Sequence, residues 1–108
     1  MKISTASKNC EIYEASVKII DLKTKKIEKM LKKMDPDSIK LDLILKYEKF
    51  FVCLINVSLP SGNIEVHSQD FAQDRSIRLS FDKLTDEIEK YKETHFPSHS
   101  KYPKRETI

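Results

Sequence analysis

Apolar side chains recur at helical spacing in the first long stretch of the chain. Residues 17–34 carry one narrow, largely apolar stripe made of Val17, Ile20, Thr24, Ile27, Leu31 and Met34. Acidic residues within 11–15 favour a helix start there, because the helix dipole stabilises negative charge in the first turn. Pro36 disfavours helical backbone at Asp35, so the helix is predicted to stop near that residue.

The next segments have the pattern of β-strands. Residues 38–47 and 51–59 alternate between apolar and polar side chains, which is typical of strands with one buried face. The positions predicted to point inward are Ile39, Leu41, Leu43, Leu45, Tyr47, Phe51, Cys53, Ile55, Val57 and Leu59. A turn over residues 60–63 leads into a short strand over 64–68. Residues 2–5, anchored by Ile3, are expected to form the first strand.

A second helical stripe follows the strands. Its members are Ile77, Phe81, Leu84, Ile88 and Tyr91. Residues 94–108 have no apolar period and contain two prolines, so we expect a flexible basic tail after a folded domain of residues 1–93.

The predicted order is β-α-β-β-β-α, which places the chain in the α+β class. Each helix has one face to bury, and the sheet has one strongly apolar face. Two helices packed on one face of a four-stranded sheet satisfy both requirements. The other face of the sheet is then mainly solvated, with Ile44, Val52 and Leu54 as minor exceptions.

Composition changes this picture mainly through charge. The 108 residues carry 34% charged side chains and a net charge of +3. Between Lys18 and Lys33 there are seven lysines and two acids, Asp21 and Glu28, a local charge of +5 (seven minus two). At about 100° per residue, most of these lysines lie opposite the apolar stripe. Such a face is typical of proteins that bind nucleic acid. The alternative is a solvated face that only maintains solubility.

Other features limit the range of functions. The chain has no run of about 18 apolar residues and no apolar signal region at its N-terminus, so we expect a cytoplasmic protein. The single glycine, Gly62, argues against a glycine-rich phosphate-binding loop. Cys10 and Cys53 are expected as free thiols, and His95 and His99 lack the further ligands of a metal site. We therefore expect no enzyme, cofactor, metal, small-molecule substrate or membrane contact.

Phe50 and Phe51 are adjacent aromatic residues, as in platforms that stack nucleic-acid bases. The strand pattern favours a different interpretation, with Phe51 packed in the core and Phe50 partly exposed. In the second helix Asp86, Glu87 and Glu89 are more simply a solvated face than a catalytic pair, since acid–base catalysis needs a pocket.

Three pieces of the chain, in this order, resemble one known family. The first is Lys8-Asn9, followed by Glu14-Ala15 and a lysine helix that ends in KKIEKML. The second is the strand-turn-strand VSLPSGNIEVHS, and the third is the helical segment IRLSFDKLTDEIEKYK. Over roughly residues 2–93 the chain resembles the ribosome hibernation-promoting factors, also called ribosome-associated translation inhibitors.

The resemblance implies a fold and a role. The fold is the β-α-β-β-β-α layer described above. The role is to bind the small ribosomal subunit and its rRNA, to occupy the channel of mRNA and tRNA, and so to inhibit translation, with the free protein a monomer. The RNA-binding positions that the resemblance implies are Lys8, Lys23, Lys25, Lys26, Lys29, Arg78, Lys83, Lys90 and Lys92. Asp86-Glu87 departs from the family, which often has Arg-Gln at this point of the second helix.

Two other functions remain open on sequence grounds. The chain could be a protein-interaction module without RNA contact, in which the lysine face is only solvated. It could also be a stand-alone RNA-binding domain that recognises A-form shape and phosphates without a ribosome.

Overall fold

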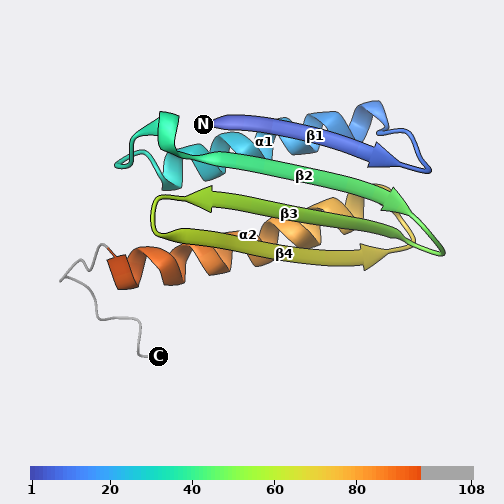
Figure 1. Ribbon diagram of the computed structural model, residues 1–108. Helices are drawn as coiled ribbons and strands as arrows, with labels where there is room; N and C mark the ends of the chain where they lie inside the picture. The colour runs from blue at the N-terminus through green and yellow to red at the C-terminus, as the bar shows by residue number, and fades with distance from the viewer. Residues whose placement is uncertain (96–108) are drawn as a thin grey trace.

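The first two strands run parallel, so the chain between them has to cross the sheet. Strands β1 (Lys2–Lys8) and β2 (Lys40–Tyr47) pair in parallel register, and helix α1 (Glu14–Met30) makes the crossing. A short 3-10 turn, Pro36–Ser38, leads from α1 into β2. Figure 1 shows the arrangement in the computed structural model, which describes residues 1–95.

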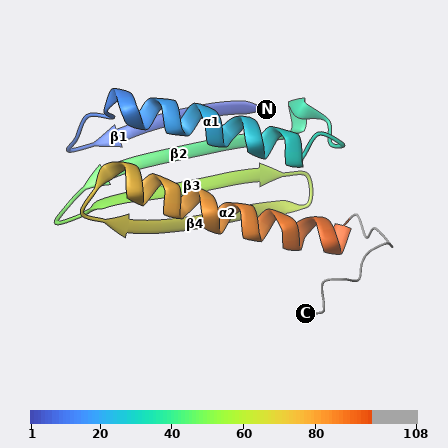
Figure 2. The ribbon, with the colours of Figure 1, turned by 180° about the vertical axis from the view of Figure 1, so that it is seen from behind.

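The rest of the sheet is an antiparallel meander. Strands β3 (Phe51–Leu59) and β4 (Gly62–Asp70) follow β2, which gives the strand order β1-β2-β3-β4. Helix α2 (Gln73–His95) follows β4, and Figure 2 shows both helices on the same face of the sheet. The predicted order β-α-β-β-β-α and the α+β class are therefore confirmed.

The core lies between this face and the two helices. The sheet residues that fill it are Ile39, Leu41, Leu43, Leu45, Cys53, Ile55, Val57, Leu59 and Val66. The helix residues that close it are Ile20, Ile27, Leu31, Ile77, Phe81, Leu84 and Ile88. Ile27 and Phe81 are each 1% exposed, as the two predicted stripes require. On the open face of the sheet, Ile44, Val52 and Leu54 are half-buried.

Three predicted inward positions differ from the structure. Phe51 is only half-buried and lies outside the core cluster. Val17 is 44% exposed, and the buried side chain of that turn is Ser16. Helical spacing places Val17 about 100° around α1 from Ser16, at the margin of the side that meets the sheet. Tyr47 is 43% exposed, because it lies at the last position of β2, where the sheet ends. The predicted burial of Val17 and Tyr47 is therefore wrong, as is the predicted core position of Phe51.

Helix α1 begins later and ends earlier than its sequence pattern indicates. The backbone N–H of Tyr13 donates to Gln73 Oε1, and Gln73 Nε2 donates to the Glu11 carbonyl oxygen, each at 2.9 Å. Because these bonds hold residues 11–13 against the start of α2, the helix begins only at Glu14. The helix ends at Met30. The residues after it form tighter turns, in which a backbone N–H donates to the carbonyl oxygen three residues earlier.

The outer strands are longer than predicted. Strand β1 pairs with β2 as far as Lys8, and β4 pairs with β3 from Gly62 to Asp70. The chain's single glycine stands directly after the two-residue turn between β3 and β4, where φ is +148°, a conformation that L side chains rarely adopt. The predicted tail begins within α2, which includes residues 94 and 95, and its residues 96–108 lie outside the described part of the chain.

Candidate nucleic-acid interface

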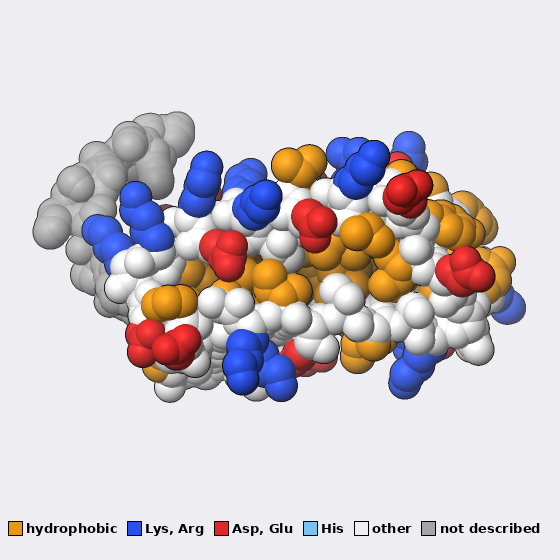
Figure 3. Space-filling view, turned by 90° about the horizontal axis from the view of Figure 1, so that it is seen from above, with side chains coloured by type: hydrophobic (Ala, Val, Ile, Leu, Met, Phe, Trp, Pro, Cys, Tyr) orange, Lys and Arg blue, Asp and Glu red, His pale blue; other side chains and the backbone are white. Residues whose placement is uncertain are grey.

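The outward side of α1 carries a row of lysines. Burial of Ser16, Ile20, Thr24 and Ile27 fixes which side of α1 meets the sheet. The exposed lysines on the remaining surface, including the turn after the helix, are Lys18, Lys25, Lys26, Lys29, Lys32 and Lys33. We call these six residues the lysine face. Figure 3 looks onto the edge formed by α1 and β1 and shows Lys and Arg side chains standing along it.

The charge of the lysine face is only partly balanced, because Glu14, Asp21 and Glu28 stand one helical turn before Lys18, Lys25 and Lys32. None of its lysines forms an ion pair with another residue of the range 1–95. The acids of α1, which are Glu14, Asp21 and Glu28, are spaced by seven residues and so share one side of the helix. That side faces β1, because Glu28 and Met1 line the same pocket. Six lysines against three acids leave an excess of positive charge on the outward side of α1.

The structure divides the nine predicted contact residues among four surfaces. One is the lysine face, which contains Lys25, Lys26 and Lys29. Helical spacing puts Lys23, Arg78 and Lys92 on a second surface, the flanks by which the two helices, side by side in Figure 2, face each other. Lys23 and Lys92 are half-buried there, whereas Arg78 is exposed. The spacing of residues along one helix predicts which of them share a side. It does not predict whether that side packs against the sheet, against the other helix or against solvent.

The third surface follows the outer side of α2, along β4. Lys83 Nζ donates to the His67 carbonyl oxygen at 2.8 Å, and Lys90 Nζ lies 3.5 Å from Glu87 Oε2. Arg78 and Lys92 are about 140° and about 180° around the helix from Lys83, which is why they face α1 instead. Both cations beside β4 thus already have a protein partner.

The fourth surface is the open face of the sheet. Lys8 is the last residue of β1 and is exposed. Its register partner is Lys46 of β2, and Lys46 is paired with Glu48 at 3.4 Å. Lys8 is therefore on the opposite side of the sheet from the lysine face.

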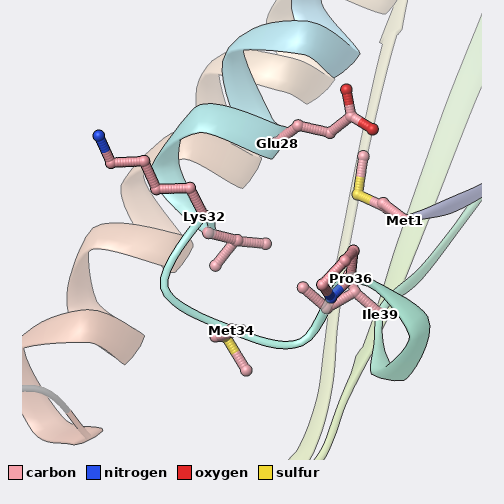
Figure 4. Close-up of a pocket in the computed structure, with 7 residues that line it drawn as sticks. Met1, Glu28, Lys32, Met34, Pro36 and Ile39 are labelled. Atoms are coloured by element: carbon pink, nitrogen blue, oxygen red, sulfur yellow. The ribbon is translucent and has the colours of Figure 1, made fainter.

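A pocket of about 250 Å³ lies at the end of α1, between that helix and the start of β1 (Figure 4). Its lining is mostly apolar and includes Met1, Leu31 and Ile39. Glu28 extends toward Met1, while Lys32 points away from the pocket. Glu28 is the one carboxylate among the lining residues, and the Lys32 ammonium points away from it, so the pocket offers no acid–base pair.

The described thiols do not form a reactive centre. Cys53 is fully buried, and burial raises the pKa of its thiol to about 12, although the Ser80 side chain opposes this shift. Cys10 is free as well and half-buried. Within residues 1–95 no group of three or more His, Cys, Asp or Glu side chains could hold a metal ion. Neither described helix has the length and apolarity that a membrane span requires.

Two surface features were not predicted. Leu22, 69% exposed, lies within the lysine face, and its spacing from Lys18, Lys25 and Lys29 could have indicated this. Aromatic residues also gather at one end of the sheet, where Phe71 is 78% exposed. The sequence shows Tyr47, Phe50 and Phe51 close together around one turn, but it does not show that Tyr13 and Phe71, from separate segments, join them.

Nearly all of the described chain matches one protein family. Residues 3–95 match the family described as Sigma 54 modulation protein / S30EA ribosomal protein. The chain belongs to this ribosome-associated family, and the resemblance to the hibernation-promoting factors is confirmed. No curated protein matches the chain in sequence.

Solved structures share the fold. A ribosomal subunit interface protein from Coxiella burnetii is 25% identical, with a TM-score of 0.63, and the match covers 85% of this chain and 98% of that one. The N-terminal domain of Protein Y from Thermus thermophilus is 24% identical, with a TM-score of 0.65, and the match covers 84% of this chain and 99% of that one. The second likeness shows the fold alone.

Proposed function

We propose that this protein binds the small ribosomal subunit through the lysine face of α1 and inhibits translation by occupying the channel of mRNA and tRNA. The contacted surface is the phosphate backbone of rRNA. The protein acts as a monomer in the cytoplasm, where ribosomes work. It needs no cofactor, because occupancy alone excludes the other ligands of the channel.

The observation that carries this proposal is the excess positive charge of the lysine face. Six exposed lysines without ion-pair partners leave donors and positive charge available to an external polyanion. Solubility alone does not require such an arrangement, because α2 also has an exposed outward side and yet carries five basic and six acidic residues from Phe71 to Glu93. Family membership supports the ribosome as the source of the polyanion.

The salt dependence of binding tests this account. Purified small subunits are sedimented with the protein at salt concentrations from about 50 to about 200 mM. If six lysines each neutralise one phosphate, the affinity falls by roughly a thousandfold over this range, because each contact releases condensed counterions. An affinity that stays constant across the series would rule out a phosphate contact of this size.

Two parallel measurements separate the alternatives. Translation in a purified system should stop as the subunits become occupied. Binding to an isolated RNA duplex of similar length should be weaker than binding to the subunit. Equal affinities would favour a stand-alone RNA-binding domain instead. Subunit binding without salt dependence would favour a protein-interaction module.

A further inference from the structure

Five of the chain's nine Phe and Tyr residues gather at one end of the molecule. They are Tyr13, Tyr47, Phe50, Phe51 and Phe71, and we call them the aromatic end. The ring centroids of Tyr47 and Phe51 are 5.0 Å apart, those of Tyr13 and Phe51 are 6.1 Å apart, and those of Phe50 and Phe71 are 4.8 Å apart. Figure 3 shows hydrophobic side chains at this end, on the right, where β1 finishes.

Core packing does not account for all of these rings. Phe50 and Phe51 are half-buried and close the end of the sheet. Phe71 is 78% exposed and Tyr13 is 54% exposed, so both rings face solvent while touching the cluster. An exposed aromatic surface beside a closed core is typical of a binding site.

Tyr13, Tyr47, Phe51 and Phe71 line a hollow that is wide open to solvent and has polar groups at its wall. Its volume is about 510 Å³, within the range of about 300–1,000 Å³ that is usual for small-ligand sites. Asn9 and Glu11 line it together with Tyr13, Tyr47 and Phe71. An amide, two phenol hydroxyls and a carboxylate offer donors and acceptors, which the edge of a nucleobase also carries, while the rings offer π faces.

This wall is held in place by bonds across the fold. Gln73, 3% exposed, accepts from the Tyr13 backbone N–H and donates to the Glu11 carbonyl oxygen, so two wall residues are tied to the start of α2. Asn9 has a positive φ of 58°, a conformation that Asn tolerates better than most residues. The backbone of two wall residues is therefore fixed by the fold.

The charges around the aromatic end suit one nucleotide better than a long phosphate track. Lys8 and Lys49 are exposed and form no ion pair among residues 1–95. Lys46 is held by Glu48 at 3.4 Å, and Asp70 accepts from the Ala72 backbone N–H at 2.8 Å. Two available lysines are enough for the phosphates that flank a single base.

We propose that the aromatic end binds one unpaired RNA nucleobase, stacked on Tyr13 and Phe71, with Lys8 and Lys49 on the flanking phosphates. The inference rests on the proposed function in taking RNA as the partner. It assigns a second kind of contact, to a base, away from the phosphate contacts of the lysine face.

Paired oligonucleotides test this proposal. The full chain is titrated into a labelled single-stranded RNA hexamer and into the same hexamer with its central positions abasic, so the phosphates are identical. The intact hexamer should bind about 5- to 150-fold more tightly, since stacking of one base on aromatic rings gives a difference of this order. In a Tyr13→Leu/Phe71→Leu variant, which keeps apolar bulk, the difference should disappear while the melting temperature is retained.

Other outcomes overturn the proposal without touching the proposed function. Equal affinity for the two hexamers in the unaltered protein would eliminate base stacking. If the double Leu variant lost subunit binding although the hexamers bound alike, the aromatic end would be a protein-docking surface. Replacement of Lys25, Lys26 and Lys29 by Gln should weaken both hexamers by the same factor. A change in their ratio would place the base at α1 and contradict the assignment.

Discussion

The two helices have the same role on their inward sides, where both pack on the sheet, but they differ in charge on their outward sides. Both present an apolar stripe to one face of the sheet, and both bury a small serine against it, Ser16 in α1 and Ser80, which donates to the Cys53 carbonyl oxygen, in α2. Outward, α1 carries lysines without ion-pair partners, whereas the two lysines of α2 beside β4 are engaged by His67 and Glu87. Since the fold imposes only the inward pattern, the outward difference reflects a requirement other than folding.

The largest effect is expected from truncating the inward stripe. Phe81 and Ile27 are each 1% exposed, one on each helix. Phe81→Ala should lower the free energy of unfolding by about 3–5 kcal/mol, and Ile27→Ala by about 2–5 kcal/mol, because each leaves a cavity in the core. Urea titration measures both. An unaltered unfolding midpoint for either variant would contradict the equal inward role of the two helices.

The buried thiol beneath α2 should be far less reactive than the thiol that precedes α1. The pKa of Cys53 is raised to about 12 from 9.0, so its thiolate fraction at pH 8 is about a thousandfold below that of an ordinary thiol. A thiol reagent should label Cys10 first and Cys53 only after unfolding. A Cys10→Ser variant isolates the slow reaction, and fast labelling of that variant in the folded state would contradict the burial of Cys53.

The Cys53 thiol should make the free energy of unfolding fall at alkaline pH. Because the pKa of Cys53 is higher in the folded than in the unfolded protein, its contribution to stability is complete below about pH 9. The contribution declines as the pH rises from about 9 to about 12, since only the unfolded chain then loses the proton. Comparison with Cys53→Ala in alkaline urea titrations measures this difference.

A smaller change in ribosome affinity is expected when the acids of α2 are replaced. Asp86→Arg/Glu87→Gln removes two acids from α2, adds one base and releases Lys90 from its partner. We expect subunit affinity to rise by about tenfold or less, with a salt slope steeper by about 1 to 2. Surface changes of this kind alter stability by about 0.5 kcal/mol at most. A loss of affinity would show that α2 needs its acids for binding.

The helices and strands were predicted better from the sequence than the contacts that each of them makes with the rest of the fold. Periodicity identified most inward residues of β2, β3 and α2, because burial repeats at fixed spacing along one element, but it also placed the exposed Tyr47 among them. It failed at Val17, where Ser16 packs instead, and at the start of α1, which depends on hydrogen bonds to Gln73, about sixty residues away. Local patterns carry no information about such distant partners.

The candidate site shows the same limit. The lysines of α1 were predictable from their spacing opposite the stripe. The division of the nine predicted residues among four surfaces was not, because it depends on which neighbour each flank of a helix meets. The aromatic end was not predictable either, since Tyr13, Phe51 and Phe71 come from three different segments.

The most direct test of the account compares equal charge changes on the two helices. One variant replaces Lys25, Lys26 and Lys29 by Gln, and the matched variant replaces Arg78, Lys83 and Lys90 by Gln. Each removes three positive charges from exposed positions and keeps good helix formers. Both should unfold at nearly the same urea concentration as the parent, and affinity for small subunits is then measured across the salt series.

The account predicts that the α1 variant loses affinity steeply at low salt, with a salt slope shallower by about 3, and no longer inhibits translation. The α2 variant should lose much less, because two of its three cations already have partners in the protein. If the α1 variant bound and inhibited as well as the parent, the lysine face would be a solubilising surface only, and the central claim would be contradicted.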